Sequence, residues 1–176
     1  MHEESQRRFH FQPNTQEDKT CILNKSSQDP CSCSACHPLR ISSVVTGQTF
    51  GAEHTILKQV SNVRLSGKVE MTRDLQECDI IIIFCPIISR VGSDVDAAMG
   101  NMAGHKPAIL VLMHHTRDVD YSTSGRKWSE KYPNVKLELH VLYHETQPGL
   151  LDCQQNTEAI SEIQKELYEN SRWRWA

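Results

Sequence analysis

The chain has 176 residues, of which 38% are hydrophobic, and a formal net charge of -3. This length and composition fit one ordinary globular domain with a tail. Acidic and basic residues are scattered along the chain, so no basic stripe is available for a phosphate backbone, and nucleic acid is not the expected partner. The longest mostly apolar run, Ile80 to Ile88, is too short to cross a bilayer, and the start lacks the apolar stretch of a signal peptide. We therefore expect a cytoplasmic protein without a membrane partner.

Residues 1–38 are rich in Gln, Ser, Asn, Asp and Glu and poor in branched aliphatic residues. Such a segment buries too little apolar surface to offset the entropy of ordering it, which predicts a disordered N-terminal tail before a domain over residues 39–176. The tail contains the cysteine-rich cluster Cys31, Cys33, Cys36 and His37, with Cys21 ten residues earlier. Zinc accepts such ligands. The spacing is tighter than in paired zinc knuckles, however, so an exposed cysteine segment without metal is the favoured interpretation.

From residue 40 onward, strand-like segments alternate with helical or polar ones, a pattern typical of parallel strands joined by crossovers. Residues 41–45 predict a first strand, and a helix is predicted over 52–60 because Ile56, Leu57 and Val60 form an apolar stripe. A weak second strand is predicted over 68–71. Residues 79–85 form a continuous apolar run, which predicts a central strand covered on both faces.

The second half of the chain continues the alternation. Residues 93–104 predict a helix capped by Ser93, and 108–113 predict another central strand. Apolar and polar residues alternate over 135–143, which predicts an edge strand with one wet face, and 157–168 predict a closing helix. Together these elements predict an α/β protein with an open, mostly parallel five-stranded sheet in the flavodoxin-like order 2-1-3-4-5, with helices on both faces.

The loop after the first strand contains Thr46, Gly47, Gln48 and Thr49. A glycine flanked by hydroxyl residues at a helix N-terminus can hold a phosphate with backbone N–H groups. These residues resemble the T-G-x-T core of the flavodoxin phosphate loop, which implies a phosphate site; an ordinary glycine turn is the alternative. In the predicted strand order, ligands bind beyond the carboxyl ends of strands one and three. Residues 86–93 offer no aromatic ring to stack on a flavin, so we expect no cofactor.

A second motif follows the third strand, with Gly92, Ser93, Asp94 and Asp96. It resembles the G-T-x-x-E stretch of nucleoside 2-deoxyribosyltransferase-like proteins, in which the glutamate is the nucleophile at the sugar carbon. The resemblance implies that Asp96, one methylene shorter, would be the catalytic residue of an N-glycosidase acting on a nucleoside or nucleotide, with Ser93 and Asp94 binding the ligand. Alternatively, Asp94 and Asp96 simply favour the positive end of the helix dipole.

Histidines follow the last two strands, His114 and His115 after one and His144 with Glu145 after the other. Imidazoles can bind a transition metal or act as a general base. Adjacent residues of a strand point to opposite faces, so His114 and His115 are poor joint ligands. Solvated strand ends without a metal are the favoured interpretation, and Cys85 is interpreted as packing.

Four segments resemble an uncharacterised family of small proteins expanded in bony fish, namely residues 44–49, 84–98, 107–116 and 144–151. This resemblance implies no particular activity. Two hypotheses remain: a non-catalytic binding or interaction module, for a nucleotide, another phosphate-bearing small molecule or a protein partner, and the N-glycosidase that uses Asp96. The module is preferred, because no residues adjacent in sequence form an evident nucleophile and base, and the motif lacks its glutamate.

Overall fold

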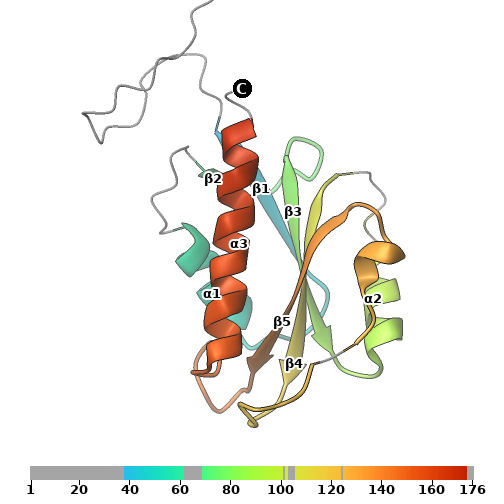
Figure 1. Ribbon diagram of the computed structural model, residues 1–176, viewed down its shortest axis with the longest axis vertical. Coiled ribbons are helices and arrows are strands. Elements are labelled where there is room, and N and C mark those ends of the chain that lie inside the picture. Colours follow the sequence, from blue (N-terminus) through green and yellow to red (C-terminus); the bar gives the residue numbers. More distant parts are fainter. Residues whose placement is uncertain (1–37, 62–68, 101, 103–105, 124, 174–176) are drawn as a thin grey trace, which may run out of the picture.

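A computed structural model describes residues 38–61, 69–100, 102, 106–123 and 125–173. One sheet has the order β2-β1-β3-β4-β5, and all neighbouring strands are parallel (Figure 1). Its strands are β1 (Leu39–Val45), β2 (Val69–Met71), β3 (Ile80–Ile87), β4 (Ala108–His115) and β5 (Val135–Tyr143). The predicted flavodoxin-like α/β class and strand order are therefore confirmed, with β3 and β4 inside the sheet and β5 at an edge. The N-terminal tail and its cysteine-rich cluster lie outside the described residues.

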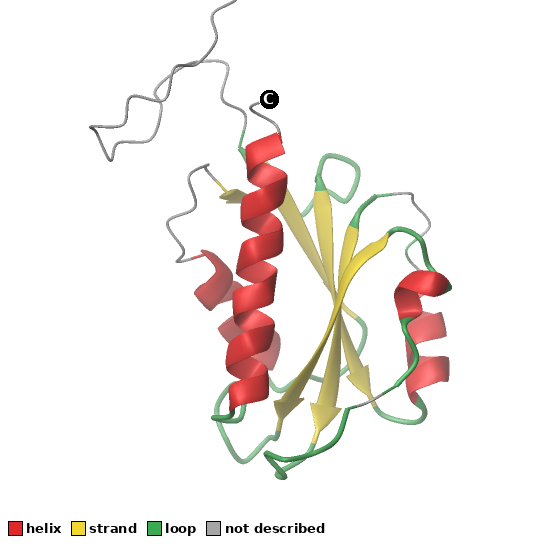
Figure 2. Ribbon diagram, in the orientation of Figure 1, coloured by secondary structure: helices red, strands yellow, loops and turns green. Residues whose placement is uncertain are grey.

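Helices cover both faces of the sheet, but unequally (Figure 2). On one face, α1 (Ala52–Ser61) and α3 (Gln154–Trp173) pack on a core that includes Ile56, Ile163 and Leu167. On the other face, α2 (Val91–Gly100) and the short 3-10 helix η1 (Trp128–Glu130) pack on a separate core. Both cores draw on β3 and β4, whose side chains are buried on both sides of the sheet because the strands are almost wholly apolar.

The start of α2 differs from the prediction. Ser93 is exposed and does not cap the helix, which begins two residues earlier, at Val91. Asp94 stabilises the entry instead: its carboxylate accepts hydrogen bonds from the backbone amides of Ile88 and Ser89, both at 2.9 Å, and from the Ser89 hydroxyl. These hydrogen bonds hold residues 88 and 89 against the first turn of α2, so the helix begins before the expected cap, Ser93. α2 also ends earlier than predicted, at Gly100, because Met102 is described and is not helical; the predicted last residue, Gly104, lies outside the described residues.

Two further differences from the prediction, the start of α3 and the exposure of β5, depend on long-range contacts. α3 begins at Gln154, three residues before the predicted start, and the predicted stripe of Ile160, Ile163 and Leu167 is buried. The face of β5 predicted to be wet is only partly so, because Glu138 and His140 are half-buried and Leu142 is fully buried. η1 accounts for part of this cover, since the backbone amide of Trp128 donates to the Glu138 carboxylate at 2.6 Å.

Candidate functional site

The loops after β1 and β3 meet at the reversal point of the strand order. The Thr46 amide donates to the Phe84 carbonyl at 3.0 Å, so the first loop leaves the sheet along β3. A Cβ atom on Gly47 would lie 2.8 Å from Pro86 Cγ, which is closer than side chains tolerate. Glycine at position 47 therefore reflects close packing of the first loop on the end of β3, which leaves no room for a ligand between Gly47 and Pro86.

Apart from this contact, the loop after β1 is exposed to solvent. Gly47, Gln48 and Phe50 are exposed, and within the described part of the chain their backbone amides donate to no acceptor. The Gln48 carbonyl accepts a hydrogen bond from the Tyr143 hydroxyl at 3.0 Å, which ties the loop to the end of β5. Phe50 has a φ of 52°, an uncommon conformation for a residue with a side chain, and Gly51 follows with a φ of 84°. This turn presents the Phe50 ring to solvent and toward β4.

Thr49 is placed differently from the other predicted loop ligands. It is buried, and its hydroxyl donates to the carboxylate of Glu53, in the first turn of α1. The other oxygen of Glu53 lies 2.8 Å from His54 Nδ1. Because the hydroxyl is already engaged and a carboxylate faces the same helix end, an anion at this loop would be held by the exposed amides rather than by Thr49.

The predicted catalytic residue, Asp96, faces away from Asp94. Asp94 and Asp96 are two positions apart on α2, so their side chains are separated by about 200° around the helix axis. Asp96 accordingly contacts residues just after η1, with its Oδ1 accepting from Lys131 Nζ at 2.7 Å and from the Tyr132 hydroxyl at 2.6 Å. These two hydrogen bonds, Lys131 first, lower the pKa of Asp96 below its ordinary value. The structure thus brings Asp94 to the loop after β3 and Asp96 to the β4–β5 connection.

The histidines at the strand ends separate into two pairs, as the alternation of side chains along a strand requires. His114 points to the α2 face, where its Nε2 lies 2.9 Å from His140 Nδ1. His115 points the other way and contacts Glu145 and His144. Tyr143 is the partner of His115 in the β4–β5 ladder, so His144 follows directly beside it. The sequence indicated both strand ends but not this pairing, because the ladder shifts register between Ala108 and Ile109.

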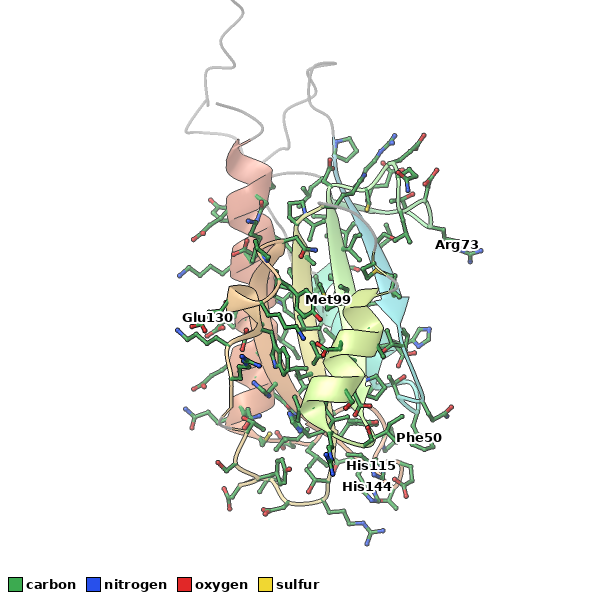
Figure 3. The ribbon with its side chains drawn as sticks, turned by 90° about the vertical axis from the view of Figure 1, so that its right-hand side faces the viewer. Phe50, Arg73, Met99, His115, Glu130 and His144 are labelled. Carbon is green, nitrogen blue, oxygen red and sulfur yellow. The ribbon has the colours of Figure 1, made fainter. Side chains whose placement is uncertain are left out.

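Exposed apolar side chains gather at the same end of the sheet. Seven large hydrophobic residues are exposed in the described part of the chain, and Met71 and Tyr168 lie elsewhere. The other five end β1 or lie in the loops after β1, β3 and β4: Val45, Phe50, Ile88, Val119 and Tyr121. Figure 3 shows Phe50 beside His115 and His144 at this end. We call these five residues, with His115 and His144, the carboxyl-edge surface.

Two shallow grooves flank α3. One, of about 470 Å³, lies between α1 and α3 and is lined by residues such as Gln59 and Gln164. The other, of about 580 Å³, contains Val119 and Tyr121 and runs to the start of α3 at Gln154 and Gln155. The second groove is therefore continuous with the carboxyl-edge surface, so this surface includes a concave region as well as exposed apolar side chains.

Comparison with known proteins adds little beyond the fold. No protein-family profile matches the chain, and no curated protein does. Among solved structures, the chain is similar to two-electron reduced flavodoxin from Megasphaera elsdenii, with 10% sequence identity and a TM-score of 0.43 over 73% of this chain and 98% of that one. A similarity of this extent does not bear on function. Within the described residues, no helix is long and apolar enough to span a membrane.

Proposed function

We propose that this chain is a non-catalytic binding module that senses a nucleotide, or another phosphate-bearing small molecule, at the carboxyl-edge surface. The gathering of exposed apolar side chains there is the observation that carries the proposal. Exposed apolar side chains are unremarkable singly, but a group of them rimmed by polar residues marks a binding surface. In open α/β sheets, ligands bind beyond the carboxyl ends of the strands, where this surface lies.

The chemistry of the surface suits a ligand with one flat apolar part and one anionic part. Phe50 is 52% exposed, so a nucleobase can stack on its ring. Beside it, the exposed amides of Gly47 and Gln48 can donate to phosphate oxygens, and the guanidinium of Arg117, in the loop after β4, adds positive charge. A protein partner that inserts an aromatic side chain would use the same apolar group.

The N-glycosidase hypothesis has weaker support from the geometry. A nucleophile must be directed at the sugar carbon beside the loops after β1 and β3, whereas the carboxylate of Asp96 contacts Lys131 and Tyr132 of the β4–β5 connection, both through Oδ1. The predicted ligand residue Asp94 is likewise engaged with Ile88 and Ser89. An Asp96→Asn variant that abolished turnover of a nucleoside while sparing its binding would restore the enzyme hypothesis.

Thermal unfolding with a panel of nucleosides and nucleotides tests the module. A ligand that binds only the folded state at about 100 times its Kd adds about 2.7 kcal/mol, and for a chain of this size Tm should rise by roughly 5 to 10 °C. Phe50→Ala should reduce this rise, because it removes the stacking ring. Tyr168→Ala is the matched control, since Tyr168 is also an exposed aromatic residue but lies on α3.

The glycine of the loop is a poor choice for this experiment. Substitution of Gly47 by Val would drive the new side chain into Pro86 and displace both loops, so a lost response would not report on the ligand alone. If no compound raises Tm, or if Phe50→Ala and Tyr168→Ala reduce the rise equally, the proposal fails.

A further inference from the structure

The side chains of His115, His144 and Glu145 converge on one point beyond the ends of β4 and β5. One ligand atom of each lies within 4.8 Å of the other two. His115 Nε2 contacts Glu145 Oε2, and His144 Nε2 lies 3.3 Å from the same oxygen. We propose that these three side chains form a binding site for a divalent transition metal ion, with zinc as the expected occupant. This inference goes beyond the proposed function, because it requires no nucleotide.

The three proposed ligands lie at the carboxyl ends of two neighbouring strands. His115 is the last residue of β4, and His144 follows the last residue of β5, its neighbour in the ladder. Their imidazole rings stack with centroids 4.6 Å apart and planes 16° apart, and both Nε2 atoms lie near the same carboxylate. The in-plane lone pairs of nearly parallel rings cannot both point at one ion, so one imidazole must rotate when a metal binds. Because β4 fixes the backbone of His115 and His144 directly follows β5, binding needs side-chain rotation rather than ordering of a distant segment, which limits its cost in conformational entropy.

Neighbouring side chains hold the imidazoles in place. The His115 ring is flanked by Phe50, with centroids 5.8 Å apart, and by Tyr143 edge-on at 5.4 Å. Thr146 contacts His144 Nδ1 through its hydroxyl at 2.9 Å and its amide at 3.2 Å. The amide donates to Nδ1, which requires this nitrogen to be unprotonated, so metal binding through Nε2 would exchange that bond for one from Nδ1–H to the hydroxyl, which can accept as well as donate. Metal-ligating histidines usually have such a partner on the other ring nitrogen.

The nature of the ligands selects the class of ion. Two imidazole nitrogens and one carboxylate oxygen suit zinc and neighbouring first-row ions, whereas calcium and magnesium prefer oxygen ligands throughout. The side chains of His115 and Glu145 are 38% and 43% exposed, so an ion has an open path to the site. Three protein ligands leave at least one coordination position for water or an external ligand.

One nearby charge opposes a cation. Arg117 Nε donates to His144 Nε2 at 3.3 Å, and this guanidinium would have to withdraw when a metal binds. Arg117 is exposed, so it can do so. Removing its charge in Arg117→Gln should therefore tighten metal binding, an effect opposite to that expected for any metal ligand.

Cobalt binding to the full, reduced chain tests the site, because Co²⁺ replaces zinc and its visible spectrum reports its ligands. We expect one equivalent of Co²⁺ with ligand-field bands and without thiolate charge-transfer bands. Replacing Cys21, Cys31, Cys33 and Cys36 by Ser should leave these bands unchanged, which separates the site from the cysteine-rich cluster. Zn²⁺ should displace the cobalt.

Single variants assign the ligands. His115→Ala and Glu145→Gln, both at exposed positions, should each weaken Co²⁺ binding by at least about tenfold, and Thr146→Val by about 10- to 100-fold through the orientation of His144. His54→Ala, at a histidine that is 82% exposed on α1, is the control and should change nothing. Cobalt binding that is absent, that shows only thiolate bands, or that survives both His115→Ala and Glu145→Gln would overturn the proposal. None of these results depends on whether a nucleotide binds.

Discussion

His114 makes the stability of the fold depend on pH. It is 7% exposed, beside His140 and the Tyr121 ring. Burial, and then the neighbouring His140, lower the pKa of His114 to about 4, and burial lowers the pKa of His140 as well. In the unfolded chain a histidine titrates near its ordinary pKa of about 6.5. Below that pH the unfolded state therefore binds more protons than the folded state.

We predict that the free energy of unfolding is greatest above pH 6.5 and falls as the pH drops from about 6.5 to about 4, with roughly 3 kcal/mol lost through His114. Urea denaturation at about pH 7.5 and about pH 5 should show about 2 kcal/mol of this loss, because pH 5 lies about 1.5 units below the pKa of the unfolded chain. The difference between the two pH values should shrink in His114→Gln and persist in His54→Gln, where the histidine is exposed. An equal pH dependence in both variants would show that His114 is not its source.

At the scale of the elements, Asn156 ties α3 to the sheet. Its Oδ1 accepts from the Leu142 amide, and its Nδ2 donates to the carbonyls of Leu142 and Leu151, all at 2.8 Å. Asn156→Leu keeps the volume but leaves the Leu142 amide and the Leu151 carbonyl without a partner, whereas the Leu142 carbonyl still accepts from the Leu151 amide. Because each unsatisfied buried group costs about 1 to 3 kcal/mol, we predict a loss of at least about 2 kcal/mol in urea denaturation.

A second asparagine of α3 provides the comparison. Among the residues that the structure describes, Asn170 donates only to Glu166 of the same helix, so Asn170→Leu should cost less than about 1 kcal/mol. A similar cost for the two substitutions would mean that the bonds of Asn156 across elements contribute nothing particular.

The elements predicted best from sequence are those whose signal is local. β3 and β4 are continuous apolar runs, and their central position follows from that character alone. The start of α3 was wrong because Gln154, Gln155 and Asn156 are polar, and the helix is favoured there by side-chain bonds, those of Asn156 and Gln155 to β5 and that of Gln154 to Glu158. The start of α2 was wrong because Asp94, inside the helix, replaces a cap at Ser93.

The candidate site was predictable in part for the same reason. Sequence placed polar loops and histidines at the carboxyl edge, since all parallel strands end there. It could not reveal that Glu53 takes the Thr49 hydroxyl, that Gly47 packs on Pro86, or that His115 meets His144. Each of these contacts depends on strand register or on side-chain packing between segments far apart in the chain.

At the scale of the whole molecule, a single tryptophan forms part of the cover of one sheet face. The connections before β3 and β5 have no α-helix within the described residues, so α2 and η1 cover this face together. Trp128 is 5% exposed and packs in the same core as Val95 and Leu112. We predict that Trp128→Ala lowers the free energy of unfolding by about 3 to 5 kcal/mol, measured in urea.

The same variant should bind a hydrophobic dye in the folded state, because part of the sheet loses its cover. Tyr168→Ala, on the helix that covers the opposite face, removes a ring that is 37% exposed, so it should lower the free energy of unfolding by less than Trp128→Ala does and should leave dye binding unchanged. Dye binding equal to that of the wild-type protein would show that α2 alone shields the face.

The strand order also has a consequence for how the chain assembles. β1 pairs along most of its length with β3, across 38 residues from Thr46 to Phe84, and with β2 over only three residue pairs. During synthesis, the apolar residues of β1 therefore leave the ribosome well before their main partner exists. The chain loses conformational entropy when this long loop closes, before the hydrogen bonds between β1 and β3 can form, so pairing of the strands is slower than helix formation. We expect β1 to be the segment that chaperones protect and that seeds aggregation when synthesis stalls before β3.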